Sequence, residues 1–440
     1  MELKYTLNQR PPMAHLLTYG LQWLILSIPN VLTVAMLAKI QFYDDIVQQT
    51  LYLQKLYAVL GMTMIAQALW GHRMPLVVGP AAVLIVGILT AQSAGFNAVY
   101  TAIAVGGVAL FLVSISGLLK KIQTIFTPRI IITILGLIGM TLAPVFLDLI
   151  FKTGSPLFNF GFTVIAILAT FILNNLLKGI WKSTTIIFTV VLGTAAYYLF
   201  NEIPAMPDYD YRITLDSLFI RPEFEAGTIL SFLICFFALL INELGSVQSV
   251  KDMVQADEPD KRIARGNAVV GLGNTLSGML GIIGPVDFSI SPGIIASTGC
   301  ASRYTIIPCG IGLVLCALSP SMVSVFTLLP DIIIGIMLMY IVILQLAAAF
   351  NLIVDTGSVR NFDHALTIAI PMGIGLFVAL LPQNAVAALP AILQPILSNG
   401  FVVGVLTVVM LEHLVFKKKQ RSRPYFSTIL LAEFSFLFCH

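Results

Sequence analysis

The chain has 440 residues, of which 58% are hydrophobic and only 10% are charged, with a net charge of +3. Soluble proteins carry about 25% charged residues, so this composition excludes a soluble enzyme of this size, a disordered chain and a nucleic-acid binder. The five cysteines form no CxxC pair and are expected to be packing residues, so no metal site or cofactor is predicted. The composition therefore predicts an all-α polytopic membrane protein.

The chain divides into about fourteen apolar segments of the length that a membrane-spanning helix needs. They are expected near 14–38, 52–70, 74–93, 98–119, 128–150, 160–177, 183–200, 226–248, 264–282, 286–299, 303–320, 329–350, 364–381 and 395–416. With the N-terminus inside, all basic residues lie on the inner side except Lys39, Lys55, Lys152, Arg212 and Arg221. This bias supports an even number of spans with both termini cytoplasmic.

Splitting the chain after the seventh segment gives two halves of similar length, and an odd number of spans gives the halves opposite topology. Inverted repeats of this kind are common in secondary transporters, with the substrate site in broken helices near the midplane. The third and tenth segments occupy corresponding places and are interrupted by proline and glycine, at 75–80 and 284–293. They predict two short facing β-strands, each leading into a half-helix whose N–H groups face a cavity. Two proline-kinked helices without a site are the alternative.

Two acids in these segments are candidate site residues. Glu243 lies in the middle of an apolar run, where an acid costs about 2.5–3.5 kcal/mol and is a functional-site hypothesis by default. We expect Glu243 to bind substrate N–H groups and to exchange a proton, unless it only bonds the backbone of the broken helix nearby. Asp287 is the second proton-coupling candidate, and it either contacts the cavity or faces the outer side.

Other candidates for substrate contact are weaker. Ser289 and Ser291 offer hydroxyl groups to a ligand or cap the half-helix. Gln22, in the first span, is an amide contact or an interhelical hydrogen bond. Backbone N–H groups near Ala81, Ala82 and Gly293 are expected to meet substrate carbonyls. The five histidines lie near span ends or termini, and we expect them at the membrane interface.

Four segments match known motifs: GLQW at 20–23, QALWGHRMPLVVGP at 67–80, RGNAVVGLGNTLSG at 265–278 and PGIIASTGCASRY at 292–304. They resemble the xanthine/uracil permeases, also called nucleobase–ascorbate transporters or nucleobase:cation symporters, and the resemblance runs from about residue 14 to 416. It implies a core domain from 14–119 and 226–320 and a gate domain from 128–200 and 329–416. The charge bias described above makes residues 417–440 a cytoplasmic tail. The resemblance also implies a homodimer, with Glu243 in the place of the family's base-binding glutamate.

Several polar site positions of the family are replaced here, so the sequence diverges at the substrate site. Apolar or small residues stand at these positions: Trp23, Ala82, Val247, Val270, Ile290 and Ser291. Glu243 is the main polar group that this chain retains.

The sequence therefore predicts a secondary active transporter of the bacterial inner membrane, and not an enzyme. It is expected to import a small planar solute, a nucleobase of the uracil, xanthine or purine type, by alternating access with a co-transported proton, or sodium in its place. The alternative keeps the fold and transports an organic or inorganic anion at the half-helix N-termini.

Overall fold

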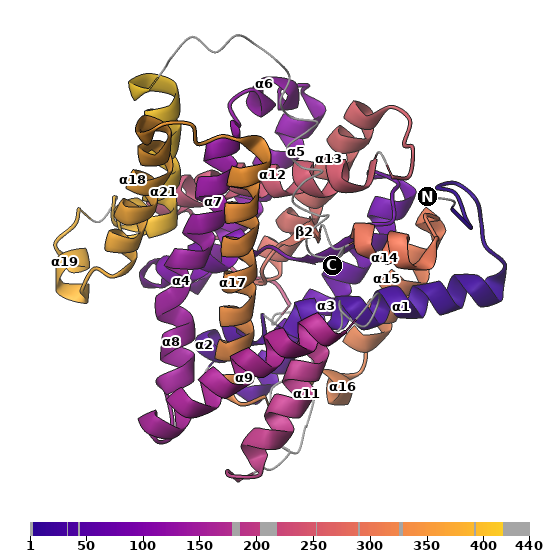
Figure 1. The fold of residues 1–440 in the computed structure, drawn as a ribbon, viewed down its shortest axis with the longest axis horizontal. Helices are drawn as coiled ribbons and strands as arrows, with labels where there is room; N and C mark the ends of the chain where they lie inside the picture. Colours follow the sequence, from indigo (N-terminus) through magenta and orange to yellow (C-terminus); the bar gives the residue numbers. More distant parts are fainter. Residues whose placement is uncertain are drawn as a thin grey trace.

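A computed structural model describes residues 3–32, 34–42, 45–177, 185–202, 218–251, 253–288, 291–324, 329–390 and 393–416. The described part is mostly helical (Figure 1). The helices before residue 200 are α1 (Met13–Leu32), α2 (Ala35–Phe42), α3 (Ile46–Leu69), α4 (Ala82–Thr90), α5 (Phe96–Ile115), α6 (Leu119–Gln123), α7 (Pro128–Thr141), α8 (Ala143–Phe151), α9 (Pro156–Leu176) and α11 (Thr185–Tyr198).

The helices after residue 225 are α12 (Ala226–Lys251), α13 (Pro259–Met279), α14 (Ser291–Thr298), α15 (Ile306–Ala317), α16 (Pro320–Ser324), α17 (Asp331–Thr356), α18 (Phe362–Ala379), α19 (Gln383–Ala387), α20 (Gln394–Leu397) and α21 (Gly400–Met410). Two short 3-10 turns, Gln92–Ala94 and Arg303–Thr305, and a π-helical turn at Leu411–Val415 complete the described elements.

Two short strands interrupt the third and tenth apolar segments. Strand β1 (Val77–Pro80) pairs antiparallel with β2 (Pro285–Phe288), with Val78 opposite Asp287. Helix α4 follows β1 and helix α14 follows β2. The prediction of two facing strands that lead into half-helices is therefore confirmed, and it replaces the alternative of two kinked helices.

Six helical segments within the described residues are long and apolar enough to cross a membrane by length and composition. They are Phe96–Ile115, Pro128–Phe151, Pro156–Leu176, Ala226–Lys251, Asp331–Thr356 and Phe362–Ala379. Shorter apolar helices occupy other expected spans, including the segments at Met13–Ile28 and Arg303–Ala317. A polytopic membrane protein is thus confirmed, whereas the full set of fourteen spans stays a prediction.

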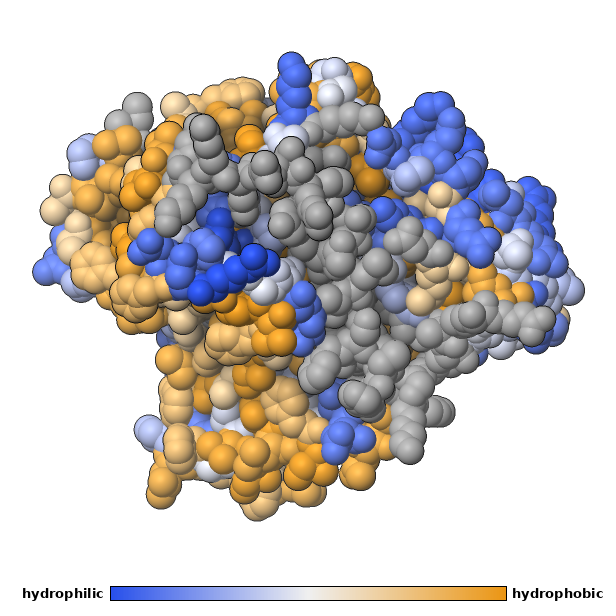
Figure 2. Space-filling model, turned by 45° about the horizontal axis from the view of Figure 1, so that its top comes forward, coloured by the Kyte–Doolittle hydropathy of each residue, from blue (hydrophilic) through white to orange (hydrophobic). Residues whose placement is uncertain are grey.

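Helix α9 shows how the fold presents apolar side chains to lipid. It exposes seven large apolar side chains, Leu157, Phe160, Val164, Ile165, Leu168, Ile172 and Leu176. Figure 2 shows hydrophobic side chains over much of the lower and left parts of one face, with hydrophilic ones gathered at the upper right. Because this apolar surface is continuous, it is suited to lipid rather than to water.

Helices α5 and α13 pack so closely that their backbones are in contact. A Cβ atom built on Gly278 lies 2.3 Å from Ala104 N, and one built on Gly271 lies 2.6 Å from Phe111 N. Small residues allow this approach, which is how helices in a membrane gain packing contacts. The glycines at these two positions of α13 therefore allow the two helices to pack closely.

Buried thiols complete the core. Cys235, Cys300, Cys309 and Cys316 are free and buried, as expected of small packing residues. Cys439 and the tail at 417–440 lie outside the described residues.

Candidate functional site

Helix α12 lies against the strand pair and completes the hydrogen bonding of one strand edge. It packs on β2, α4 and α14. The Asp287 N–H donates to Glu243 Oε1 at 2.6 Å, and the Ser246 hydroxyl donates to the Asp287 carbonyl at 2.6 Å. Backbone groups at membrane depth need such partners because no water is available to them. Glu243 thus has the structural role that the sequence left open, through one of its two carboxylate oxygens.

The other oxygen of Glu243 is differently placed. Glu243 is fully buried, and its Oε2 has no hydrogen-bond partner among the described residues. Asp287 Oδ1 is likewise buried without a described donor that reaches it, and the two carboxyl groups are near enough to interact by charge and to share a hydrogen bond when one of them carries a proton. A buried acceptor without a partner lowers the stability of the fold by about 1–3 kcal/mol. A proton or a ligand N–H group at these two oxygens removes this cost.

Asp287 faces into the protein rather than toward its surface. Its side chain is fully buried, with Oδ2 3.1 Å from the Gln67 Nε2 that donates to it and 3.2 Å from His72 Nε2. Gln67 also donates to the Gly266 carbonyl at 3.1 Å and accepts the His72 N–H at 3.3 Å. The sequence alternative in which Asp287 faces the outer side is therefore wrong.

His72 is a site residue that sequence reasoning missed. We expected it at the membrane interface because it follows a predicted span, but its side chain is fully buried. Its Nδ1 accepts the Met74 N–H at 2.9 Å. The proton of the neutral ring is then on Nε2, which faces Asp287. The cause of the error is that the chain turns inward at His72 and leads directly into β1.

Arg262 anchors the turn that carries His72. Its guanidinium donates to the carbonyls of His72 at 3.0 Å and Arg73 at 3.2 Å, and it pairs with Asp257. Arg73 has a positive φ of 56°, a conformation that L-residues with long side chains adopt only when neighbours hold them. The Arg262 contacts supply that support.

The outcome differs among the other residues that were predicted to contact the solute. The Ser291 hydroxyl, at the start of α14, accepts the Val77 N–H at 3.2 Å, so it joins the half-helix to β1. Ser289 lies outside the described residues. Gln22 lies on α1, which packs on β1, and its buried Oε1 has no partner among the described residues.

The start of α4 also lies beside the strands. The Ala81 N–H donates to the Gly284 carbonyl at 3.0 Å, so it is already used, and no side chain caps the helix that begins at Ala82. Gly293 lies in the first turn of α14. Helix α12, which carries Glu243, thus contacts both α4, whose start is uncapped, and α14.

Comparison with known proteins shows which family the chain belongs to. A family model described as "Permease family", that of the xanthine/uracil permeases, matches residues 14–384. The chain belongs to the xanthine/uracil permease family. It is similar to the uric acid permease PucJ of Bacillus subtilis (strain 168), at 24% identity over 358 residues, which are 78% of each chain. The xanthine permease of the same organism is 24% identical over 340 residues, 74% of this chain and 76% of that one. The protein is therefore a transporter of a permease family and not an enzyme.

Solved structures support the same fold. The transmembrane domain of a cyanobacterium bicarbonate transporter, BicA, matches with a TM-score of 0.63 at 15% identity, covering 84% of this chain and 96% of that one. The murine anion transporter Slc26a9, in its inward-facing state, matches with a TM-score of 0.58 at 12% identity, covering 92% and 69%. At these identities the likeness concerns the fold alone.

Three of the positions that lack the family's polar residues, Trp23, Val247 and Val270, are buried packing positions. Val247 and Val270 are fully buried apolar residues. The Trp23 indole N–H donates to the Thr305 hydroxyl at 3.1 Å, which joins α1 to the start of the α15 region. The polar groups of the site are instead Glu243, Asp287 and His72.

Proposed function

We propose that this permease imports a small planar solute of the nucleobase type, which binds through its N–H groups to Glu243. The observation that carries the proposal is the fully buried Glu243 carboxylate, with Oε1 fixed by the Asp287 N–H and Oε2 without a described partner. An ionised carboxylate accepts hydrogen bonds and donates none. The free oxygen therefore suits the N–H edge of a purine or pyrimidine ring.

Other groups complete the proposed site around the ring. The backbone N–H groups at the starts of α4 and α14 face solute carbonyls, and the Gln22 amide contributes from α1. Ala82 and Gly293 allow the solute to approach the backbone, because neither has a bulky side chain. The uric acid and xanthine permeases among the relatives support this class of solute.

Coupling to a proton follows from the two adjacent acids. Glu243 and Asp287 repel each other when both are ionised, and burial makes this repulsion costly. A proton bound at the pair removes the repulsion, and its release leaves Glu243 ionised, in its solute-binding form. His72 Nε2, 3.2 Å from Asp287 Oδ2, is the ring nitrogen next to this pair. A sodium ion in the same place is the alternative coupling ion.

The proposed movement is alternating access between two units in fourteen spans with inverted repeats. The core unit comprises 14–119 and 226–320, and the gate unit 128–200 and 329–416, with both termini cytoplasmic and pairing of two copies through the gate units. The likeness in fold to BicA supports the architecture. It does not bear on the solute, and an anion at the half-helix termini is the rival solute that Glu243 would repel unless protonated.

Uptake into proteoliposomes tests the proposal. The purified protein is given an inward proton gradient and labelled uracil, xanthine, urate or bicarbonate. Glu243→Gln should lower uptake of the preferred base about 10- to 100-fold, the range for loss of hydrogen bonds to a charged group. Its amide oxygen still accepts the Asp287 N–H, so the fold is kept. Glu223→Gln, at an exposed glutamate, is the matched control.

Two results would contradict the proposal. Uptake by Glu243→Gln equal to that of the unmodified protein would remove Glu243 from the solute site. Uptake of bicarbonate with no uptake of any base would favour the anion alternative.

A further inference from the structure

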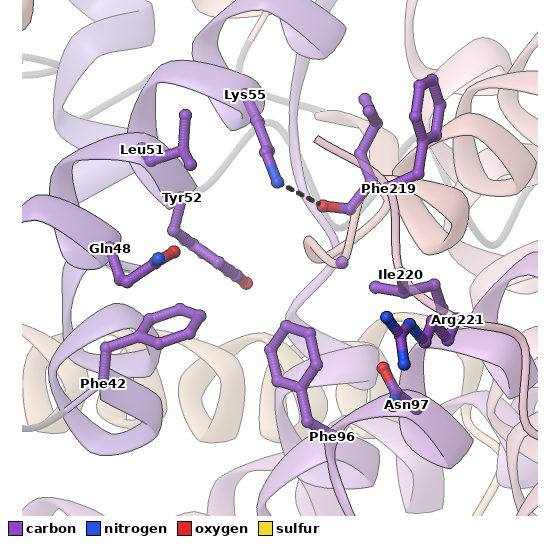
Figure 3. A pocket seen from close by; sticks show the side chains of 12 residues that line it. Phe42, Gln48, Leu51, Tyr52, Lys55, Phe96, Asn97, Phe219, Ile220 and Arg221 are labelled. Carbon is purple, nitrogen blue, oxygen red and sulfur yellow. Dashed lines mark hydrogen bonds between the residues drawn. The ribbon is translucent and has the colours of Figure 1, made fainter. Parts of the chain in front are cut away.

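A pocket lies beside the end of α13, where the chain leads toward β2. It has a cavity volume of about 240 Å³ and lies between α3, the start of α5, the end of α13 and the segment at 219–221. Figure 3 shows Phe42 and Tyr52 on one side of the cavity and Arg221 on the opposite side, with Lys55 above and Phe96 below. Neither Glu243 nor Asp287 lines it. The pocket is therefore distinct from the solute site proposed above.

Aromatic rings form one wall of this pocket. The ring centroids of Phe42 and Phe96 are 5.6 Å apart, and those of Phe42 and Tyr52 are 6.1 Å apart. Ring pairs at these distances make favourable tilted contacts, and their faces bind other flat rings. The wall thus favours a planar ligand.

Positive charge forms the other walls. Lys55 reaches the pocket from α3 and donates to the Leu280 carbonyl at 3.1 Å, and the exposed Arg221 borders the opening. The amides of Gln48 and Asn97 add neutral donors. No acidic residue is among the described residues that line the pocket. The two cations favour an anionic ligand.

The cavity size limits the ligand further. Pockets for drug-sized ligands have volumes of about 300–1,000 Å³, and this one is smaller. A one- or two-ring molecule fits that limit, whereas a nucleotide is too large. We propose that this pocket is a binding site for a small planar organic anion, stacked on the aromatic wall and held by Lys55 and Arg221.

The pocket is directly connected to the strand pair. Tyr52 is fully buried, and its hydroxyl accepts the Ile283 N–H at 3.1 Å. The next residue, Gly284, accepts the Ala81 N–H at 3.0 Å, where α4 begins. An anion that contacts Tyr52 therefore touches the residue that holds the start of β2. This connection makes the pocket a place where a ligand influences the solute site without entering it.

Equilibrium dialysis tests this inference in the Glu243→Gln background, which removes the carboxylate of the proposed solute site. The full-length protein in detergent is dialysed against labelled urate, a planar monoanion at neutral pH, and in parallel against neutral uracil. We expect urate to bind, and we expect high salt to weaken the binding because Arg221 is exposed to solvent. We expect Arg221→Glu to abolish urate binding and Arg221→Gln to weaken it about tenfold, as for a lost hydrogen bond to a charged group.

The control is Arg360→Gln, which removes another exposed arginine elsewhere in the chain and should leave urate binding unchanged. Unfolding midpoints show that each variant is folded. Absence of urate binding in the Glu243→Gln background, binding that Arg221→Glu leaves intact, or equal binding of uracil would each overturn the inference. These outcomes are independent of uptake, so they are distinguishable from failure of the proposed transport function.

Discussion

His72 Nε2 lies 3.2 Å from Asp287 Oδ2, although the two residues belong to the two different broken segments. Both side chains are fully buried. Gln67 holds both partners, because it donates to the Asp287 carboxylate and accepts the His72 N–H. The pair thus links the turn before β1 to β2 through two buried polar side chains, in contact with the strand that Glu243 supports.

Loss of either member of this pair should uncouple transport from the proton gradient. His72→Gln and Asp287→Asn each remove one side chain of the proposed proton path, whereas Glu243 is unchanged. We expect exchange of labelled base across the membrane to continue, and accumulation against a gradient to fall to the level seen with a protonophore. Proteoliposome uptake with and without the protonophore measures this.

The matched control for this prediction is His15→Gln, at an exposed histidine on α1. Accumulation by both site variants at the level of the control would show that the pair has no part in coupling. Loss of exchange together with accumulation would show that the pair holds the solute site in shape instead.

Ser291 gives a test between structural support and solute contact. Its hydroxyl accepts the Val77 N–H, so Ser291→Ala leaves a buried donor without a partner, at a cost of about 1–3 kcal/mol. We expect a lower unfolding midpoint with an unchanged KM for the solute. Ser291→Thr keeps the hydroxyl and should restore stability. A raised KM with an unchanged midpoint would instead assign Ser291 to the solute.

The packing of α13 on α5 at Gly278 is tested by comparing the stability of two glycine variants. A Cβ at this position would lie 2.3 Å from Ala104 N and 2.6 Å from Tyr100 O, both backbone atoms of α5. Backbone atoms cannot rotate away from a new side chain. Gly278→Ala should therefore lower the free energy of unfolding by about 1–3 kcal/mol. Gly161→Ala, where a Cβ meets nothing within 4 Å, should leave stability unchanged or raise it. Thermal unfolding in detergent measures both, and equal midpoints would contradict this account of the α5–α13 contact.

The sequence predicted those features of the site that depend on local chemistry. Proline removes a backbone donor and glycine disfavours a helix, so both strands could be placed from their own segments. Glu243 stood out because an acid is costly in an apolar run. His72 could not be found this way, since its burial depends on contacts with Asp287 and Gly266, which are distant in sequence. The aromatic pocket was missed for the same reason, because Phe42, Tyr52 and Phe96 come from three helices or their ends.

The ion pair of Asp257 with Arg262 predicts a dependence of stability on pH. The hydrogen bond and charge of Arg262 hold the pKa of Asp257 below its usual 3.8. A carboxyl group with a lowered pKa stabilises the fold fully above the unfolded value and loses that contribution as the pH falls through the folded value. We expect Asp257→Asn to lower the unfolding midpoint slightly at pH 7, since Asp257 is largely exposed. The difference should disappear in acid, and a difference that grows in acid would reverse the assigned sign.

Asp331, the first residue of α17, joins two parts of the structure that the proposed mechanism moves apart. Its Oδ1 lies 3.1 Å from Lys39 Nζ of α2, and its Oδ2 lies 3.2 Å from Lys152 Nζ, directly after α8. Lys39 also donates to the Leu329 carbonyl. In the proposed division, Lys39 belongs to the core unit, and Asp331 and Lys152 belong to the gate unit. The cluster therefore holds the two units together at one end.

Asp331→Asn should loosen this contact, because it removes the charge that both lysines share. Ion pairs at such partly exposed positions contribute about 0–1 kcal/mol, so amide hydrogen exchange should rise by at most about fivefold. The rise should be confined to α2 and the start of α17. Asp363→Asn, at an exposed aspartate in the first turn of α18, should leave exchange unchanged. If exchange in α2 is the same in both variants, the Asp331 cluster does not restrain movement between the two units, and the contact between α2 and α17 rests on apolar packing instead.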